Sequence, residues 1–208
     1  MNEVLAGGSG GSAKPSNRES NRRRIIVLTA PSGGGKTTIA RRVMGAIPEL
    51  SFSVSATTRP PRSREKDGVD YYFVSRKRFQ RHIDAGDLLE YEEVYPGLFY
   101  GTLQEEIERK SADSPILLDV DVRGANAVKQ RYGDDALVIF VQPPTFDILE
   151  TRLRSRATEN PATLRTRLER ARRELEYADR FDAVVVNDDV ETAVAETLGL
   201  IRQFLKAR

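Results

Sequence analysis

The residues best suited to chemistry lie in a run of small side chains from Ala30 to Thr38, whose sequence is APSGGGKTT. This run is close to the phosphate-binding pattern GxxxxGK[ST], with alanine in place of the first glycine. Glycines let the backbone curl so that successive N–H groups converge on phosphate oxygens. Lys36 would place its charge on the terminal phosphates, and Thr37 could ligate Mg²⁺ through its hydroxyl. We therefore expect phosphate binding by Ala30, Pro31, Ser32, Gly33, Gly34, Gly35, Lys36, Thr37 and Thr38.

The elements around this run decide between phosphate binding and a glycine-rich turn that binds nothing. Ile25 to Thr29 form a continuous apolar and β-branched run, which is typical of a strand buried on both faces. A helix should follow from Lys36 to about Ala46, before Pro48. This order favours phosphate binding. The acceptor of the phosphate needs other evidence, because GTPases, ATPases and small-molecule kinases share the motif.

The rest of the chain alternates between strand and helix patterns. Further buried strands are expected at 116–120, 136–141 and 183–186, with helical patterns between and after them. This alternation predicts an α/β fold with a mostly parallel core sheet. Residues 52–100 combine short β-like pieces with many prolines, glycines and tyrosines, so we expect an inserted, partly antiparallel subdomain there. Residues 1–21 have the composition of a flexible tail.

A second group of chemically capable residues follows the phosphate loop. Arg59 and Arg62 lie on a loop stiffened by prolines, and paired guanidinium groups can grip a phosphate through forked hydrogen bonds. Taken alone, such a pair is more often part of an exposed loop. The chain then continues through the motifs SVSATTRPPR, DGVDYYFV, LLEY, FYGT, LLDVDVRGA and VVVNDD. In this order they closely resemble the guanylate kinase family, over nearly the whole chain from Ile25 onward.

The resemblance implies the fold of a P-loop nucleoside monophosphate kinase with a GMP-binding insertion and an arginine-rich lid. It implies transfer of the γ-phosphoryl group of ATP to GMP with Mg²⁺, giving ADP and GDP. Residue 22 to the end would form one such domain. Its parts would be a core of about 22–52, 115–144 and 178–208, an insertion of about 53–114 and a lid of about 145–177.

The resemblance also assigns the acceptor site. The GMP phosphate would be held by Arg59, Arg62, Tyr71 and Tyr100. The guanine would be faced by Ser55, Glu90 and Thr102. A carboxylate at Glu90 can accept from both guanine N1–H and N2–H₂, whereas adenine would leave it unpaired, which disfavours the wrong base. The alternatives are a solvated charge at a strand end for Glu90 and ordinary β packing for the tyrosines.

Polar residues also follow two of the expected strands. Asp119 comes after an apolar run, as a Walker B aspartate does, and would lie near Mg²⁺ together with Thr37. By the resemblance, Asp121 would bind GMP and Asn187 would lie beside the adenine of ATP. The alternatives are a capped strand end for the aspartates and a strand-to-helix turn with an aspartate N-cap for the Asn187 stretch. Arg123 stands where the family commonly has glutamine.

The stretch 152–179 is dense in arginine and would in general form a salt-bridged amphipathic helix. Arg156 and Arg167 match the arginines of the family's lid. We expect these two, with Lys36, to be catalytic by placing positive charge on the migrating phosphoryl group when the lid closes. The family's lid sequence GRGTE is SRATE here, so both lid glycines are missing.

Composition excludes several other kinds of site. The absence of cysteine rules out disulfides, thiolate metal sites and cysteine nucleophiles. The single histidine, His82, is expected to be a surface residue on a helix. A net charge of +2 predicts neither nucleic-acid nor membrane partners, and no apolar run approaches the roughly 20 residues that cross a bilayer. Without a secretory signal, we expect a cytoplasmic protein, either a monomer or a homo-oligomer.

Two other functions stay open at this point. A related kinase could act on a phosphorylated sugar, although Ser55, Glu90 and Thr102 argue against it. A guanylate-kinase-like module could bind phosphopeptides without catalysis. Such modules typically have eroded phosphate loops, whereas Lys36 and Thr37 are present here.

Overall fold

The core of the computed structural model is a five-stranded sheet with the order β2-β7-β1-β8-β9, and all of its strand pairs are parallel. The structure describes residues 23–63, 65–155 and 161–207. Hence the predicted tail, residues 1–21, lies outside the described residues, as does Arg156. The strands of this sheet are β1 (Ile25–Thr29), β2 (Ser51–Phe52), β7 (Ile116–Asp119), β8 (Ala136–Gln142) and β9 (Ala183–Val186). The predicted α/β fold with a mostly parallel core sheet is confirmed.

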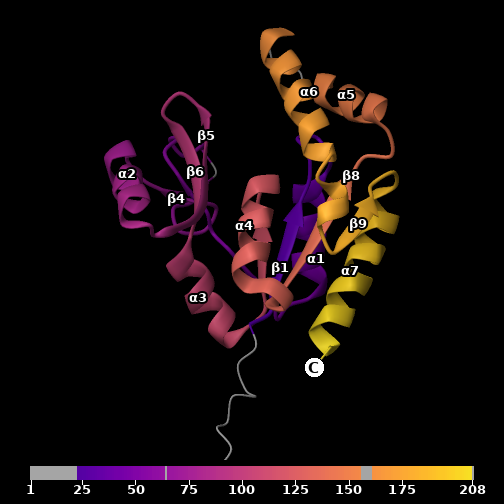
Figure 1. Cartoon of the computed structure of the whole chain (residues 1–208), viewed down its shortest axis with the longest axis horizontal. Helices are drawn as coiled ribbons and strands as arrows, with labels where there is room; N and C mark the ends of the chain where they lie inside the picture. The colour runs from indigo at the N-terminus through magenta and orange to yellow at the C-terminus, as the bar shows by residue number, and fades with distance from the viewer. Residues whose placement is uncertain (1–22, 64, 156–160, 208) are drawn as a thin grey trace, which may run out of the picture.

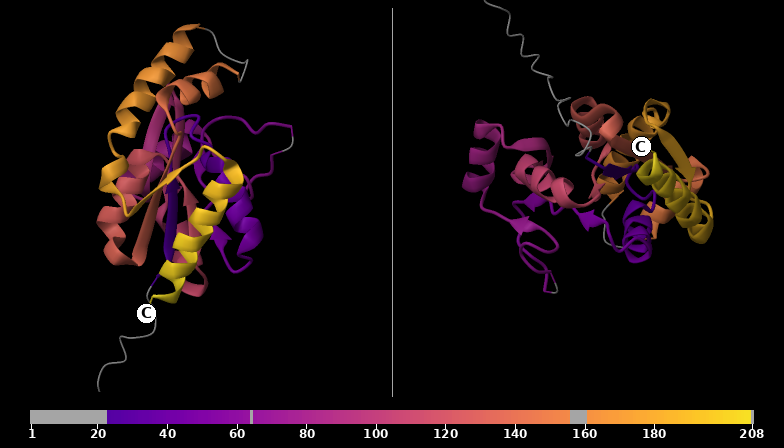
Figure 2. Two further views of the ribbon diagram at one scale, coloured as in Figure 1. Left: turned by 90° about the vertical axis from the view of Figure 1, so that its right-hand side faces the viewer. Right: turned by 90° about the horizontal axis from the view of Figure 1, so that it is seen from below.

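Helices cover both faces of this sheet (Figures 1 and 2). Alternate residues of β1 point to opposite faces, so Ile26 and Leu28 join one buried cluster while Ile25 and Val27 join another. The first cluster includes side chains of α1 (Lys36–Ala46) and α7 (Val190–Lys206). The second includes side chains of α3 (Gln104–Asp113) and α4 (Val122–Tyr132). Burial on both faces explains why these strands are continuous apolar runs.

A second, four-stranded sheet has the order β4-β3-β6-β5 and forms the insertion. Its strands are β3 (Ala56–Thr57), β4 (Tyr72–Phe73), β5 (Leu88–Tyr95) and β6 (Leu98–Leu103). The β3–β4 pair is parallel, whereas β3–β6 and β5–β6 are antiparallel, as expected for a partly antiparallel subdomain. Helix α2 (Arg76–Ala85) packs Phe79 into the small core of this sheet. His82 lies on this helix, as predicted, and contacts Asp87 at 2.9 Å.

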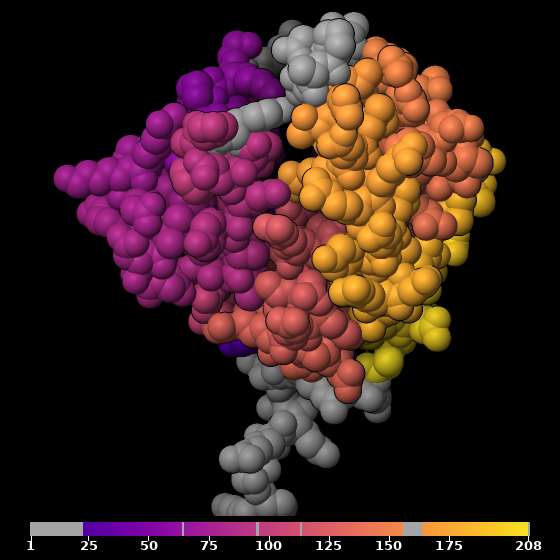
Figure 3. Space-filling view, turned by 45° about the horizontal axis from the view of Figure 1, so that its top comes forward, coloured from indigo at the N-terminus to yellow at the C-terminus, as the bar shows by residue number. Residues whose placement is uncertain are grey.

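Two helices form an arm beyond the core sheet, α5 (Phe146–Arg154) and α6 (Pro161–Leu175). They pack against each other through Leu149, Leu153 and Ala171, so the arm has a small core of its own. Short 3-10 turns occur at Gly133–Asp135 and Ala178–Arg180. Figure 3 shows the surface hollowed between the insertion and α6. Among the described helices, none has both the length and the apolar character needed to cross a bilayer.

Candidate active site

The phosphate loop links the end of β1 to the start of α1, and its glycines are required by its shape. Gly33 and Gly35 have φ angles of 91° and 95°, a region that residues with a Cβ rarely adopt. A Cβ on Gly35 would also lie 2.1 Å from the side-chain nitrogen of Asn187. Gly35 caps α1 without a side-chain hydrogen bond, so the first N–H groups of the helix are open to an anion.

Asn187 braces this loop from the end of β9. Its side chain is buried, and its Nδ2 donates to the carbonyl oxygen of Gly34 at 2.8 Å. Arg152 of α5 donates to the Asn187 carbonyl at 2.9 Å. Asp189 caps α7 by accepting from Thr192 N, so the turn with an aspartate N-cap is present. Asn187 thus holds the loop in shape, and its contact with adenine stays a prediction.

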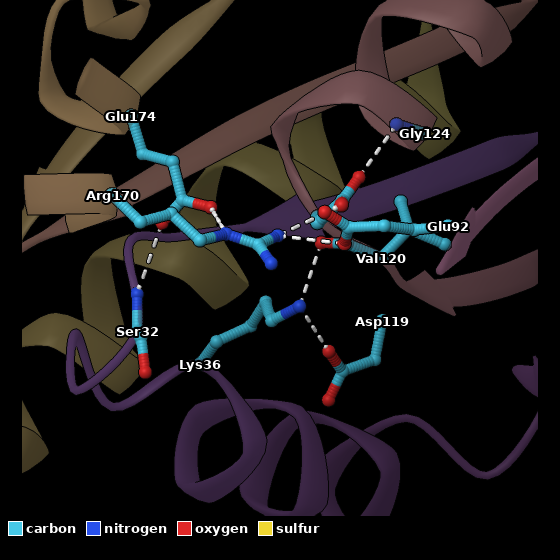
Figure 4. Close-up of polar contacts among 9 residues, drawn as sticks. Ser32, Lys36, Glu92, Asp119, Val120, Gly124, Arg170 and Glu174 are labelled. Atoms are coloured by element: carbon cyan, nitrogen blue, oxygen red, sulfur yellow. Dashed lines mark hydrogen bonds and ion pairs between the residues drawn. The ribbon is translucent and has the colours of Figure 1, made fainter. Parts of the chain in front are cut away.

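Lys36, Thr37 and Asp119 meet where β1 and β7 end side by side, and Figure 4 shows Lys36 pointing toward Asp119. Lys36 Nζ lies 2.5 Å from Asp119 Oδ1 and donates to the carbonyl of Val120 at 2.6 Å. The hydroxyl of Thr37 donates to Asp119 Oδ2 at 3.2 Å. A hydroxyl and a carboxylate are hard oxygen donors, and Mg²⁺ needs only one or two of these from a protein. The predicted metal ligands are therefore neighbours and fit Mg²⁺.

A cavity of about 590 Å³ opens above the phosphate loop and is lined by residues 30–38. Its opposite wall comes from α6, β5 and the start of α4. The side chains of that wall belong to Glu92, Val94, Asp121, Thr166, Arg167, Arg170 and Glu174. Arg167 thus faces the loop across the cavity, where a lid arginine must lie to reach a bound phosphate. Its catalytic role stays a prediction.

A second cavity of about 700 Å³ lies between the core and the insertion. Its lining includes the predicted acceptor-site residues Ser55, Arg59, Arg62, Tyr71 and Tyr100, together with Lys36, Thr37 and Asp119. Both cavities are lined by Lys36 and Thr37, so they meet at the charged end of the phosphate loop. Two anions bound in the two cavities would therefore face each other across these side chains.

Arg59 is held rigidly in the second cavity. Its Nε donates to the hydroxyl of Tyr100 at 3.1 Å, and its guanidinium lies 4.9 Å from the ring centre of Tyr71. The other edge of the guanidinium makes two 2.6 Å hydrogen bonds to Glu65, which also accepts from Arg62 N at 2.8 Å. Hydrogen bonds from Arg59 and the Arg62 backbone lower the pKa of Glu65 to about 2. Glu65 was not predicted as a site residue, although a carboxylate so close in the sequence to paired arginines indicates an ion pair with one of them.

The three residues predicted to face guanine do not all line the same cavity in this conformation. Glu90 and Thr102 are paired across β5 and β6, and the buried Thr102 hydroxyl donates to Glu90 Oε1 at 2.6 Å. Burial raises the pKa of the Glu90 carboxyl to about 7 against the pull of that hydrogen bond. Ser55 lines the 700 Å³ cavity, but Glu90 and Thr102 are not among its described lining residues. Their contact with guanine stays a prediction.

Asp121 lies at the first cavity rather than the second, where it caps α4 by accepting from Gly124 N at 2.8 Å. Its other oxygen accepts from Arg170 at 3.1 Å. Burial raises the pKa of the neighbouring Glu92 carboxyl above its usual range, and the contact with Asp121 raises it further, whereas the Arg170 guanidinium lowers it only in part. Asp121 combines the predicted strand-end cap with a place beside the phosphate loop, and its contact with GMP stays a prediction.

Arg154 and Arg165 behave as the helix pattern predicted, because they form exposed i,i+4 ion pairs with Glu150 on α5 and with Glu169 on α6. Arg170 differs because it contacts Glu92 of β5 and Asp121 at the start of α4, as well as Glu174 one turn on in its own helix. The sequence pattern predicts Arg170 only as one member of a salt-bridged helix, and it gives no signal for Glu92 or Glu174. Only the packing of α6 against the core and β5 brings these three side chains together (Figure 4).

Two cavities that share Lys36 suit the passage of a phosphoryl group from a nucleotide bound in one to a phosphate bound in the other. The fold and the site together define a P-loop nucleoside monophosphate kinase. The chain belongs to the guanylate kinase family, because the family model described as Guanylate kinase matches residues 22–204. The resemblance predicted from the motifs is thereby confirmed. Members of this family phosphorylate GMP.

Individual relatives agree with this assignment. The chain is 60% identical over 172 residues to the guanylate kinase of Salinibacter ruber, covering 83% of this chain and 92% of that protein. It is 44% identical over 171 residues to the guanylate kinase of Bacteroides fragilis, covering 82% and 84%. The crystal structure of guanylate kinase from Anaplasma phagocytophilum superimposes with a TM-score of 0.71 at 31% identity, covering 89% and 87% of the two chains.

Proposed function

We propose that this chain transfers the γ-phosphoryl group of ATP to GMP in the presence of Mg²⁺, giving ADP and GDP. The observation that carries the proposal is the meeting of the two cavities at Lys36 and Thr37, with the Arg59 clamp in the acceptor cavity. Because a chain without cysteine has no need of an oxidising compartment, we also propose that it works in the cytoplasm.

The donor phosphates would bind in the phosphate loop. Apart from Gly34, whose N–H donates to the Pro31 carbonyl, the N–H groups of the loop and of the start of α1 would supply hydrogen bonds and positive potential there. Lys36 would exchange its contacts with Asp119 and Val120 for oxygens of the terminal phosphates. Thr37 and Asp119 would hold Mg²⁺, which neutralises charge on the phosphate oxygens when bound.

The acceptor phosphate would bind between Arg59, Arg62 and Tyr100. Because the Tyr100 oxygen already accepts from Arg59 Nε, its own proton is left to donate to a phosphate oxygen. The edge of Arg59 that is held by Glu65 is unavailable, so the phosphate would meet the remaining NH2 hydrogen beside Tyr100. The guanine would then be read by Glu90, with its strand partner Thr102 and Ser55.

Transfer needs no covalent intermediate with the protein. An oxygen of the GMP phosphate attacks the γ-phosphorus of ATP, a new P–O bond forms, and the bond from that phosphorus to the bridging oxygen of ADP breaks. Lys36, Arg167 and Arg156 would stabilise the charge on the migrating group, and the lid would exclude water. Positioning and charge therefore supply the catalysis.

An ADP-release assay with ATP, Mg²⁺ and each of GMP, AMP, CMP and UMP tests the proposal. We expect turnover with GMP and little with the other three. Lys36→Ala, shown to be folded by circular dichroism, should lose turnover while still binding GMP. Efficient turnover with a different monophosphate would contradict the assigned base site, and folded wild-type protein without turnover would contradict the proposed activity.

A further inference from the structure

Arg170 of α6 lies at the centre of an ion cluster that joins three parts of the fold. Its Nε donates to Glu174 Oε1 at 2.6 Å, and its NH2 donates to Glu92 Oε2 at 2.7 Å and to Asp121 Oδ2 at 3.1 Å (Figure 4). Glu92 belongs to β5 of the insertion, and Asp121 begins α4 of the core. One guanidinium thus ties the lid helix to both. We name Arg170, Glu92, Asp121 and Glu174 the Arg170 cluster.

The Arg170 cluster is shielded from solvent more than ordinary surface ion pairs. The Arg170 side chain is 31% exposed, Glu92 and Asp121 are each 21% exposed, and Glu174 is 11% exposed. In such surroundings ion pairs are stronger and less screened than at the surface, and removing one partner leaves the others uncompensated. The relative placement of lid, insertion and core therefore depends on these contacts.

Strand β5 connects the Arg170 cluster to the proposed guanine site. Glu90 and Glu92 are two residues apart on this strand, so both side chains are on one face. Between irregularities on either side, the ladder pairs Glu90 with Thr102 and Glu92 with Tyr100, the tyrosine that holds Arg59. A movement of β5 on GMP binding would thus reach Arg170 directly.

The other end of the Arg170 cluster reaches the donor site. Glu174 Oε2 accepts from the backbone N–H of Ser32 at 3.2 Å, a phosphate-loop donor. Glu92, Asp121, Arg170 and Glu174 also line the same 590 Å³ cavity as the loop. A donor nucleotide in that cavity would therefore contact side chains that are linked through Glu92 to β5, the strand that carries Glu90.

We propose that Glu92 and Arg170 are positioning residues that couple the two substrate sites, so that bound GMP tightens the binding of the donor nucleotide. This inference rests on the proposed function, because it places GMP next to β5. Although Glu92 and Arg170 line the donor cavity, they couple it to the GMP site through the placement of α6 against β5. Because coupling between binding sites is reciprocal, the donor nucleotide also tightens the binding of GMP by the same factor.

Calorimetric titration of the full chain with Mg²⁺ and β,γ-imido-ATP, with and without saturating GMP, measures the coupling. We expect GMP to tighten nucleotide binding at least about fivefold in the wild-type chain, a typical coupling factor. In Glu92→Gln and in Arg170→Met the factor should fall towards one, and the double variant should resemble the single variants. Removing a charge near the donor cavity changes both affinities alike, so their ratio isolates the coupling.

Glu169→Gln is the matched control, because it disrupts an exposed pair with Arg165 on the same helix and should keep the wild-type factor. Glu92→Gln keeps the shape of the side chain and is decisive if Arg170→Met does not fold. A wild-type factor of one, or an unchanged factor in Glu92→Gln, overturns the inference. Wild-type chain that turns over GMP but shows no coupling refutes only this inference, whereas failure to bind or phosphorylate GMP refutes the proposed function itself.

Discussion

Glu90 provides the sharpest link between structure, stability and the proposed base selectivity. Burial raises the pKa of its carboxyl from 4.5 to about 7, with further repulsion from Asp121 and Glu92 opposed by the hydrogen bond from Thr102 and the charge of Lys36. Ionising this group in the folded chain therefore costs about 3 kcal/mol more than in the unfolded chain. The proposed guanine site thus carries a carboxylate that weakens the fold when it is ionised.

The sign of the pH dependence follows from the raised pKa. A group whose pKa is higher in the folded chain contributes stability that is fully present below its unfolded value and is lost as pH rises through the folded value. Glu90→Gln cannot ionise and still offers an oxygen to the Thr102 hydroxyl. Between pH 5.5 and pH 8, the wild-type chain should therefore lose about 2 kcal/mol of unfolding free energy relative to this variant.

Urea denaturation of both proteins at the two pH values measures this difference, because the other titrating groups cancel in the comparison. The variant should exceed the wild-type chain in unfolding free energy by about 3 kcal/mol at pH 8 and by only about 1 kcal/mol at pH 5.5. An equal stability difference at both pH values would refute the assigned environment of Glu90. In the kinase assay, the same variant should lose preference for GMP over AMP, and unchanged preference would remove Glu90 from the base site.

Three further predictions follow from the site. Lys36→Met should lower turnover by at least about a hundredfold with little change in GMP affinity, measured by steady-state kinetics and calorimetry, whereas retained turnover would refute its role at the migrating phosphoryl group. Gly35→Ala should destabilise the chain by at least about 1 kcal/mol and weaken ATP binding, and this loss should shrink in an Asn187→Ala background if the predicted steric clash is the cause. Glu65→Gln should reduce the preference for GMP over guanosine in binding assays. It should have no such effect in an Arg59→Lys background, because lysine lacks the two guanidinium nitrogens that donate to Glu65.

Sequence patterns predicted the parts of this fold that are local in the chain. The apolar run of β1, the glycines and Gly-Lys-Thr that follow it are contiguous, so the strand, loop and helix could be placed together. The partly antiparallel insertion was predicted from its composition, and its sheet has that character. Asp119 was placed near Thr37 because it follows an apolar run as a Walker B aspartate does, and the two side chains do meet, at 3.2 Å.

Contacts made by tertiary packing could not be predicted in the same way. Arg170 and Glu92 are 78 residues apart, and Asn187 and Gly34 are 153 residues apart. Neither pair has a sequence signature, because both depend on how α6 and β9 lie against the rest of the chain. For the same reason Asp121 was placed with GMP by resemblance, although its carboxylate lies at the cavity above the phosphate loop.

Direct transfer moves the γ-phosphoryl group of ATP to GMP without releasing it as inorganic phosphate. Incubating the full chain with Mg²⁺, GMP and ATP labelled at the γ-phosphate, and then separating the nucleotides, tests it most directly. We expect the label to enter GDP and little of it to be released as inorganic phosphate. Label recovered mainly as inorganic phosphate, or transferred to AMP, CMP or UMP in preference to GMP, would contradict it.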